Sequence, residues 1–214
     1  MEVITLRDNH EEAVNIVSRA ISSGGLVAVP TDTVYGIIGN ATDTKAISSL
    51  YDLKKRPKEQ RFPVFMRDIA MARWYAYISD AKARFLETVW PGPVTVVFNH
   101  KEKLSDMLTS SLDTIGMRVP NDRFLLKLLS HINIPLVQSS ANIRGLAPSK
   151  NIQEIIASFE GQKIKPDLVV DGGELLGDPS VIIDLTAREP RILRSGVMSK
   201  DELAVLLTRL IQDV

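Results

Sequence analysis

The chain alternates short runs of apolar residues with longer stretches in which apolar residues recur every three or four positions. The first such stretch, residues 10–22, is predicted to be a helix capped by Asn9, with an apolar face made of Ala13, Ile16, Val17 and Ala20. Two glycines at 24–25 end it, and the apolar run Leu26–Val29 follows as a buried strand. The chain therefore begins with the alternation of strand and helix that is typical of α/β proteins.

The same alternation continues to the C-terminal end. Further helices are predicted at 44–56, 80–88, 122–130 and 152–159, and Ser199 is expected to cap a last helix with Leu203, Val205, Leu206 and Leu210 facing inward. Further strands are predicted at 63–66, 94–98, 115–119, 136–138, 168–170, 181–185 and 192–193. This order predicts an α/β fold with an open mixed sheet and flanking helices, and the length of 214 residues suits one domain over residues 1–214.

Composition and charge narrow the possible functions. Lys and Arg number 26, as do Asp and Glu, so bulk charge does not indicate a nucleic-acid-binding protein and any anion site must be local. There is no cysteine and only three histidines, far apart, so neither a zinc site nor a cysteine nucleophile is indicated. No signal pattern or apolar run of membrane-spanning length is present, and we expect a cytoplasmic protein without a membrane partner.

Four segments place polar or charged residues directly after an apolar run, where ligands collect in open α/β sheets. They are Thr31–Gly36, Lys54–Arg56, Ser139–Asn142 and Arg191–Gly196. Each segment alone has a simpler interpretation. Thr-Asp-Thr suits a local turn or a helix cap, and the basic triplet suits a helix C-terminus.

Together, the four segments supply cations, hydroxyls and an amide, which is a plausible set of ligands for phosphate groups. The standard nucleotide signatures, GxxxxGK[ST] and GxGxxG after a strand, are absent from the sequence. So are the GxSxG elbow and the Cys/His pair of covalent catalysts. The sequence therefore predicts an anion site of unusual construction and no side-chain nucleophile.

From Pro30-Thr31-Asp32-Thr33-Val34-Tyr35-Gly36 onward, the sequence resembles the YrdC/YciO-like family of threonylcarbamoyl-AMP synthases in its short form. Matching motifs follow in the family's order along nearly the whole chain. They are Lys54–Pro57 (Lys-x-Arg-Pro), Trp90–Thr95 (Pro-Gly-Pro-x-Thr), Thr114–Pro120 (Gly-x-Arg-x-Pro), Ser140–Asn142 followed by Gly145, Ser180–Leu185 and Ile192–Gly196. The resemblance implies a twisted sheet around a large basic cavity.

The resemblance also implies a reaction and its site. ATP, L-threonine and bicarbonate or CO2 would give threonylcarbamoyl-AMP and pyrophosphate, with Mg2+ carried on ATP and no protein metal site. Threonine would contact Thr33, Arg118, Gln138 and Ser180. ATP would contact Lys54, Arg56, Thr114, Ser140, Asn142, Ser149 and Arg194, of which Lys54, Arg56, Ser140 and Asn142 form the family's signature tetrad.

The product would serve N6-threonylcarbamoyladenosine modification of tRNA. The implied partners are a downstream threonylcarbamoyl transferase and tRNA, the latter met indirectly or by weak direct binding. Residues 57–61 are a candidate lid over the cavity.

Two features depart from the family pattern. Many members carry a threonine-binding histidine shortly after Lys-x-Arg-Pro, but residues 61–67 contain none. In addition, residues 65–68, 114–120 and 171–186 look especially like the YciO branch, which often lacks the intact tetrad. This chain keeps the tetrad, which favours a synthase.

Two alternatives to the synthase remain. One is a YciO-like RNA-binding protein with weak or different nucleotide activity. The other is carbamoyl chemistry on another substrate, as in the related domain of the hydrogenase-maturation carbamoyltransferases.

Overall fold

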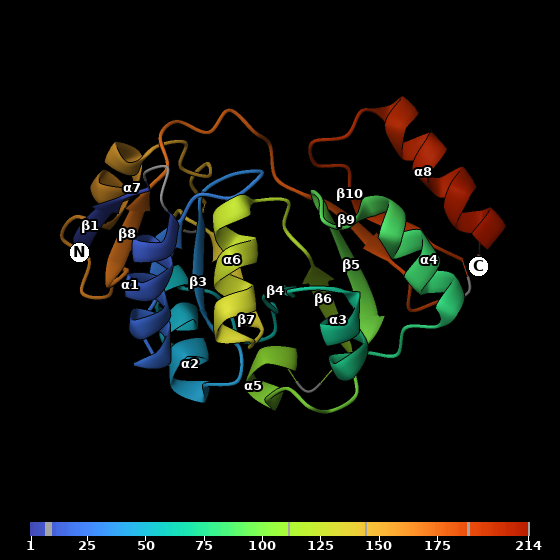
Figure 1. Ribbon diagram of the computed structural model, residues 1–214, viewed down its shortest axis with the longest axis horizontal. Coiled ribbons are helices and arrows are strands. Elements are labelled where there is room, and N and C mark those ends of the chain that lie inside the picture. Colours follow the sequence, from blue (N-terminus) through green and yellow to red (C-terminus); the bar gives the residue numbers. More distant parts are fainter. Residues whose placement is uncertain (7–9, 111, 144, 188, 214) are drawn as a thin grey trace.

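A computed structural model describes residues 1–6, 10–110, 112–143, 145–187 and 189–213 (Figure 1). Its helices are α1 (His10–Ser22), α2 (Thr44–Lys54), α3 (Ile69–Tyr75), α4 (Asp80–Val89), α5 (Asp106–Thr109), α6 (Arg123–Ile132), α7 (Ile152–Phe159) and α8 (Lys200–Asp213). Its strands are β1 (Glu2–Thr5), β2 (Val27–Val29), β3 (Gly36–Asn40), β4 (Val64–Phe65), β5 (Val94–Asn99), β6 (Thr114–Arg118), β7 (Leu136–Ser140), β8 (Leu168–Asp171), β9 (Val181–Asp184) and β10 (Arg191–Arg194).

Most of the predicted elements are present, and local signals explain their bounds. Side chains of Asp43, Asp122 and Asn151 cap α2, α6 and α7 by accepting a backbone N–H from the first turn. The predicted cap Asn9 and the side chain of Leu210 lie outside what the structure describes. At the opposite end of α2, Lys55 adopts a left-handed conformation and terminates the helix.

The sequence predictions were wrong at a few points. Val205 is 54% exposed rather than inward-facing, because on a helix it lies about 200° around the axis from the buried Leu203, whereas Leu206 shares the face of Leu203. Strands β1 and β3 and helices α3 and α5 were not predicted. In β3 only Ile37 and Ile38 are apolar between two glycines, and pairing with β2 and β7 makes this segment a strand.

Ten strands of the described residues form one sheet, in the order β1-β8-β2-β3-β7-β4-β6-β5-β9-β10. The sheet is mixed, since β4 pairs in parallel with β6 but antiparallel with β7. This confirms the predicted class, an open mixed sheet with flanking helices. Figure 1 shows the N-terminal end at one edge and the C-terminal helix α8 at the other.

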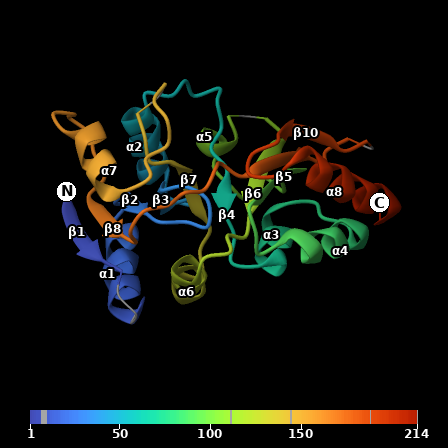
Figure 2. The ribbon, with the colours of Figure 1, turned by 90° about the horizontal axis from the view of Figure 1, so that it is seen from above.

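The two faces of the central strands have different surroundings. On β5 and β6, Val94, Val96, Ile115 and Met117 are fully buried in the main core. Because successive side chains of a strand point to opposite faces, Thr95, Val97, Gly116 and Arg118 share the other face. Figure 2 shows α2 and α7 on one side of the sheet and α1 and α6 on the other.

Two long segments pass over the second face of the sheet, which is the face that carries Thr95 and Arg118. One is residues 55–63 between α2 and β4, which include the predicted lid residues 57–61; from here on we call this whole segment the lid. The other, which we call the strap, is residues 172–180 between β8 and β9, and it crosses from one half of the molecule to the other (Figure 1). Tyr35 holds the strap near its start, because its hydroxyl donates to the Gly173 carbonyl (2.6 Å) and accepts from the Gly172 N–H (3.0 Å).

Within the described ranges, no helix has both the length and the apolar character needed to cross a bilayer.

Candidate active site

A pocket of about 460 Å³ lies on the second face of the sheet, beneath the lid and the strap. Strands β5, β6, β7 and β9 form its floor, and the loop from β2 to β3 forms one wall. Four arginines and one glutamate are the charged residues among its lining: Arg56, Glu59, Arg61, Arg118 and Arg194. The pocket is therefore suited to an anionic ligand.

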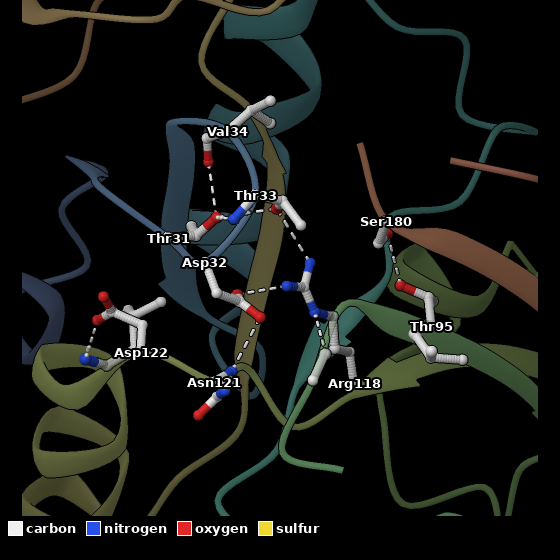
Figure 3. A network of polar contacts seen from close by, with 12 residues as sticks. Thr31, Asp32, Thr33, Val34, Thr95, Arg118, Asn121, Asp122 and Ser180 are labelled. Atoms are coloured by element: carbon white, nitrogen blue, oxygen red, sulfur yellow. Dashed lines mark hydrogen bonds and ion pairs between the residues drawn. The ribbon is translucent and has the colours of Figure 1, made fainter. Parts of the chain in front are cut away.

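The loop from β2 to β3 is folded by its own hydroxyl groups (Figure 3). Thr31 donates to the Val34 carbonyl at 2.7 Å and accepts the Thr33 N–H at 3.0 Å. Its hydroxyl also lies 3.0 Å from that of Thr33. The local turn proposed for this segment is thus present, and it aims Thr33 into the pocket.

Arg118, at the end of β6, is the most constrained of the pocket arginines. Its guanidinium donates to the Gly92 carbonyl (2.9 Å) and the Thr33 hydroxyl (3.2 Å), and it forms an ion pair with Asp32 (Figure 3). Burial lowers the pKa of Arg118, and the Asp32 carboxylate partly offsets this shift. Asp32, in the centre of the Thr-Asp-Thr segment, therefore makes a long-range contact rather than a local cap.

Lys54 lies behind the pocket, at the end of α2. Its ammonium donates to the Ser140 carbonyl (2.7 Å), the Asn142 carbonyl and the Asn142 side-chain oxygen (2.8 Å). The Ser140 hydroxyl donates to the same side-chain oxygen at 2.6 Å. Lys54 thus fixes the segment after β7, and the alternative in which it only complements the dipole of its own helix is wrong.

The environment of Lys54 also changes its acidity. Only 5% of the residue is exposed. Burial, followed by the positive charge of nearby Arg56, lowers the pKa of Lys54 from 10.5 to about 8. An anion in the pocket would favour the protonated form.

A second polar chain runs along the opposite side of the pocket. The Arg194 guanidinium donates to the Ser180 carbonyl (2.9 Å) and hydroxyl (3.0 Å), and that hydroxyl lies 3.0 Å from the hydroxyl of Thr95. Burial, followed by the charge of Arg118, lowers the pKa of Arg194. The two guanidiniums therefore repel each other across the pocket, and a bound anion would relieve this repulsion.

The lid contributes two further arginines. Arg56 donates to the Arg61 carbonyl (2.8 Å), and its guanidinium lies 4.7 Å from the centre of the Phe62 ring. Arg61 in turn donates to the backbone and side-chain oxygens of Thr114. In this conformation the lid is connected to β6 across the pocket.

Seven of the eleven site residues predicted from the sequence line this pocket. They are Thr33, Arg56, Arg118, Gln138, Ser140, Ser180 and Arg194. Lys54 and Asn142 are buried directly behind Ser140 and bonded to it or to each other. Thr114 is bonded to the pocket residue Arg61, and Ser149 is buried with its hydroxyl on the Ala141 carbonyl at 2.6 Å.

Several pocket residues were not predicted. The lid contributes Glu59, Gln60 and Arg61 to the pocket. The polar and charged character of this stretch was the signal in the sequence that could have indicated them. Thr95 ends the Pro-Gly-Pro-x-Thr motif, and its position on the same strand face as Val97 follows from strand alternation. Asp32 was quoted with its motif but was given no role.

Both the sequence and the mixed sheet of this chain are similar to those of known proteins. The Sua5/YciO/YrdC family model, described as "Telomere recombination", matches residues 19–196, and the chain belongs to this family. The chain is 32% identical over 204 residues to the threonylcarbamoyl-AMP synthase of Pyrococcus abyssi (strain GE5 / Orsay). That match covers 94% of this chain and 59% of the relative, so the chain spans about three fifths of the archaeal protein.

Other relatives are covered more fully. The threonylcarbamoyl-AMP synthase of Rattus norvegicus is 31% identical, over 94% of this chain and 72% of the relative. Among solved structures, P. abyssi Sua5 complexed with L-threonine matches with a TM-score of 0.88 at 30% identity, over 97% of this chain and 61% of that one. E. coli YciO matches with a TM-score of 0.83 at 25% identity, over 92% and 96% of the two chains.

Proposed function

We propose that this protein is a threonylcarbamoyl-AMP synthase, a nucleotidyltransferase that forms threonylcarbamoyl-AMP and pyrophosphate from L-threonine, bicarbonate or CO2, and ATP. The observation that carries the proposal is the convergence of Arg56, Arg118 and Arg194, from three distant segments, on one pocket with Ser140. Guanidinium groups bind phosphate and carboxylate oxygens through paired N–H donors. The relatives named as synthases support the same activity.

We assign the threonine contacts to the side of the pocket that contains Arg118. Its guanidinium would bind the amino-acid carboxylate, and the hydroxyls of Thr33 and Ser180 would bind polar groups of threonine. Gln138, on β7, also lines the pocket and would complete this group. No histidine lines the described part of the pocket, so these side chains would replace the histidine of other members.

The triphosphate would be held by Arg56 and Arg194. The Ser140 hydroxyl would be a further donor once its single O–H turns from the Asn142 side-chain oxygen to a phosphate. Lys54 and Asn142 would act from behind Ser140, by shaping its segment and adding positive charge. Thr114 would become available to ATP once Arg61 leaves it, and Ser149 would support the segment through Ala141. Mg2+ would arrive on the phosphates and keep mostly water ligands.

The reaction requires no protein nucleophile. The threonine amine first combines with CO2 to give a carbamate, which is N-carboxythreonine. A carbamate oxygen then attacks the α-phosphorus of ATP, and the bond to pyrophosphate breaks. The pocket's role would be to hold the two substrates in line and to stabilise the negative charge that builds on the phosphates. The lid and strap would exclude water from the unstable carbamate.

The test is to incubate the protein with ATP, Mg2+, bicarbonate and each amino acid, and to measure pyrophosphate and the adenylate product. We expect pyrophosphate release that requires both threonine and bicarbonate. Release without threonine, or none in its presence, would contradict the proposal. Salt-sensitive binding of RNA without pyrophosphate would instead favour the RNA-binding alternative.

The product would then pass to a threonylcarbamoyl transferase that modifies tRNA, and we expect both steps to take place in the cytoplasm.

A further inference from the structure

Asp32 and Arg118 form an ion pair at the wall of the pocket that the proposed reaction has not used. The two side chains are 11% and 3% exposed, so the pair is nearly sealed from water. Arg118 lines the pocket, whereas Asp32 does not. Asp32 therefore contacts Arg118 from outside the pocket lining, and Figure 3 shows the two side chains pointing toward each other.

Both carboxylate oxygens of Asp32 are engaged. One accepts from Arg118, and the other accepts the backbone N–H of Asn121 at 3.0 Å. Asn121 follows β6 by a few residues, so Asp32 connects the loop from β2 to β3 with the end of β6. A carboxylate held at both oxygens is a rigid acceptor, and it fixes the plane of the guanidinium bonded to it.

The guanidinium of Arg118 is held by all three of its nitrogens. Nε donates to Gly92, one terminal nitrogen to Thr33 and the other to Asp32. A guanidinium has five N–H donors. Among the described residues, protein acceptors take three of them, which leaves one N–H on each terminal nitrogen. Two such donors match the two oxygens of a carboxylate.

Asp32 also changes the charge that Arg118 presents. An arginine with its full charge in this pocket would be drawn to the triphosphate, which is the more highly charged ligand. Pairing with Asp32 offsets part of that charge while leaving the two N–H donors in place. Arg118 would then select a ligand by the geometry of its oxygens rather than by total charge.

We propose that Asp32 is a positioning residue that makes Arg118 specific for the carboxylate of the amino-acid substrate and prevents Arg118 from acting as a phosphate ligand. This inference rests on the proposed function for the identity of that substrate. Asp32 itself would touch neither substrate.

The test compares Asp32→Asn with Asp52→Asn, an exposed aspartate on α2 outside the pocket, as the matched control. Threonine and ATP affinities are measured separately by calorimetry, and KM and kcat are measured by pyrophosphate release. For Asp32→Asn we expect threonine affinity to fall at least about 10-fold, ATP affinity to stay equal or to rise, and kcat at saturating threonine to stay within about 3-fold. The control should match the wild type.

A second readout does not depend on catalysis. The Nε–H signal of Arg118, assigned by its absence in Arg118→Lys, reports the bond to Gly92 in nitrogen-15 NMR spectra. It should be sharp in the wild type and in Asp52→Asn, and broadened or shifted in Asp32→Asn. If Asp32→Asn does not fold, Asp32→Glu keeps the charge but displaces the guanidinium, and it should weaken threonine binding without weakening ATP binding.

The outcomes separate the two proposals. A wild-type protein that binds threonine but releases no pyrophosphate would overturn the synthase proposal and leave the role of Asp32 decided by affinity and NMR. Unchanged threonine affinity in Asp32→Asn, equal losses for threonine and ATP, or a wild type that binds no threonine would overturn the role proposed for Asp32.

Discussion

The Lys54 ammonium lies 2.8 Å from the side-chain oxygen of Asn142, and it also donates to the backbone carbonyls of Ser140 and Asn142. An ammonium has three N–H donors, so these contacts use its full capacity. Lys54 therefore acts through Ser140 and Asn142 in this conformation. Three of the four tetrad residues form one connected unit, and the fourth, Arg56, lines the pocket.

The first prediction concerns this unit. Lys54→Met keeps the length of the side chain but removes every donor, so the carbonyls of Ser140 and Asn142 and the Asn142 side-chain oxygen lose the ammonium. We expect the free energy of unfolding to fall by about 2 kcal/mol, the usual cost of leaving buried acceptors unsatisfied, and ATP binding to be lost. Urea denaturation and calorimetry measure the two effects. Lys45→Met, at an exposed position on the same helix, is the control.

The second prediction concerns pH. Between pH 8, the pKa of Lys54 in the folded chain, and 10.5, its ordinary value, the unfolded chain holds the proton more tightly. Stability should therefore rise with pH across this window. ATP affinity should change in the opposite direction, because the charged ammonium that favours phosphate is lost above about pH 8. Calorimetric titrations with ATP, at a pH below and a pH above this pKa, measure the change in ATP affinity.

The variant Lys54→Met has no ammonium to titrate, so its stability should lack the rise that the wild type shows. If both proteins gave the same stability profile over this window, the titration could not be assigned to Lys54.

The third prediction concerns the lid. Arg56→Ala removes the proposed phosphate ligand as well as the contacts with the Arg61 carbonyl and the Phe62 ring. We expect threonine-dependent pyrophosphate release to fall at least about 100-fold, equivalent to about 3 kcal/mol of transition-state stabilisation, with little change in melting temperature. Asn142→Ala should likewise abolish the reaction. Full activity with normal melting in either variant would remove that residue from the site.

Arg56→Lys distinguishes charge from shape. Lysine keeps the positive charge but loses the planar guanidinium that binds oxygens in pairs and stacks on Phe62. For Arg56→Lys we therefore expect threonine-dependent pyrophosphate release to fall nearly as far as in Arg56→Ala.

The fourth prediction concerns the strap. A Cβ added at Gly177 would lie 2.2 Å from the Thr33 carbonyl oxygen, so Gly177→Ala must displace the strap or the loop that carries Thr33. We expect threonine KM to rise at least about 10-fold, because Thr33 and Arg118 are bonded to each other. Leu176→Ala, at a neighbouring side chain that is 80% exposed, should leave the kinetics unchanged.

The sequence predicted much of this fold because apolar periodicity and capping residues are local signals. Helix α7 was predicted with its observed bounds, since Asn151 caps a segment whose Ile152, Ile155 and Phe159 share one buried face. Strand β3 was missed because its glycines and Asn40 are typical of a loop. Only the neighbouring strands, brought there by the rest of the fold, supply its partners.

The candidate site was predicted in the same uneven way. Residue types after strands indicated Thr33, Ser140 and Arg194, because strand ends define where ligands bind. The partners of buried charges were not predictable, since Asp32 meets Arg118 and Lys54 meets Asn142 across more than eighty residues of chain. Such pairs depend on how segments pack, which periodicity does not report.

Strand β4 has a mechanical consequence. It contains only Val64 and Phe65, yet it joins β7 to β6 and so connects the two halves of the sheet. A ligand that contacts Ser140 on one half and Arg118 on the other would stabilise the short β4 connection, because it would link the two halves a second time. Hydrogen exchange at the backbone amides of β4 should therefore slow when both substrates are present, even though a two-residue strand buries little of the ligand itself.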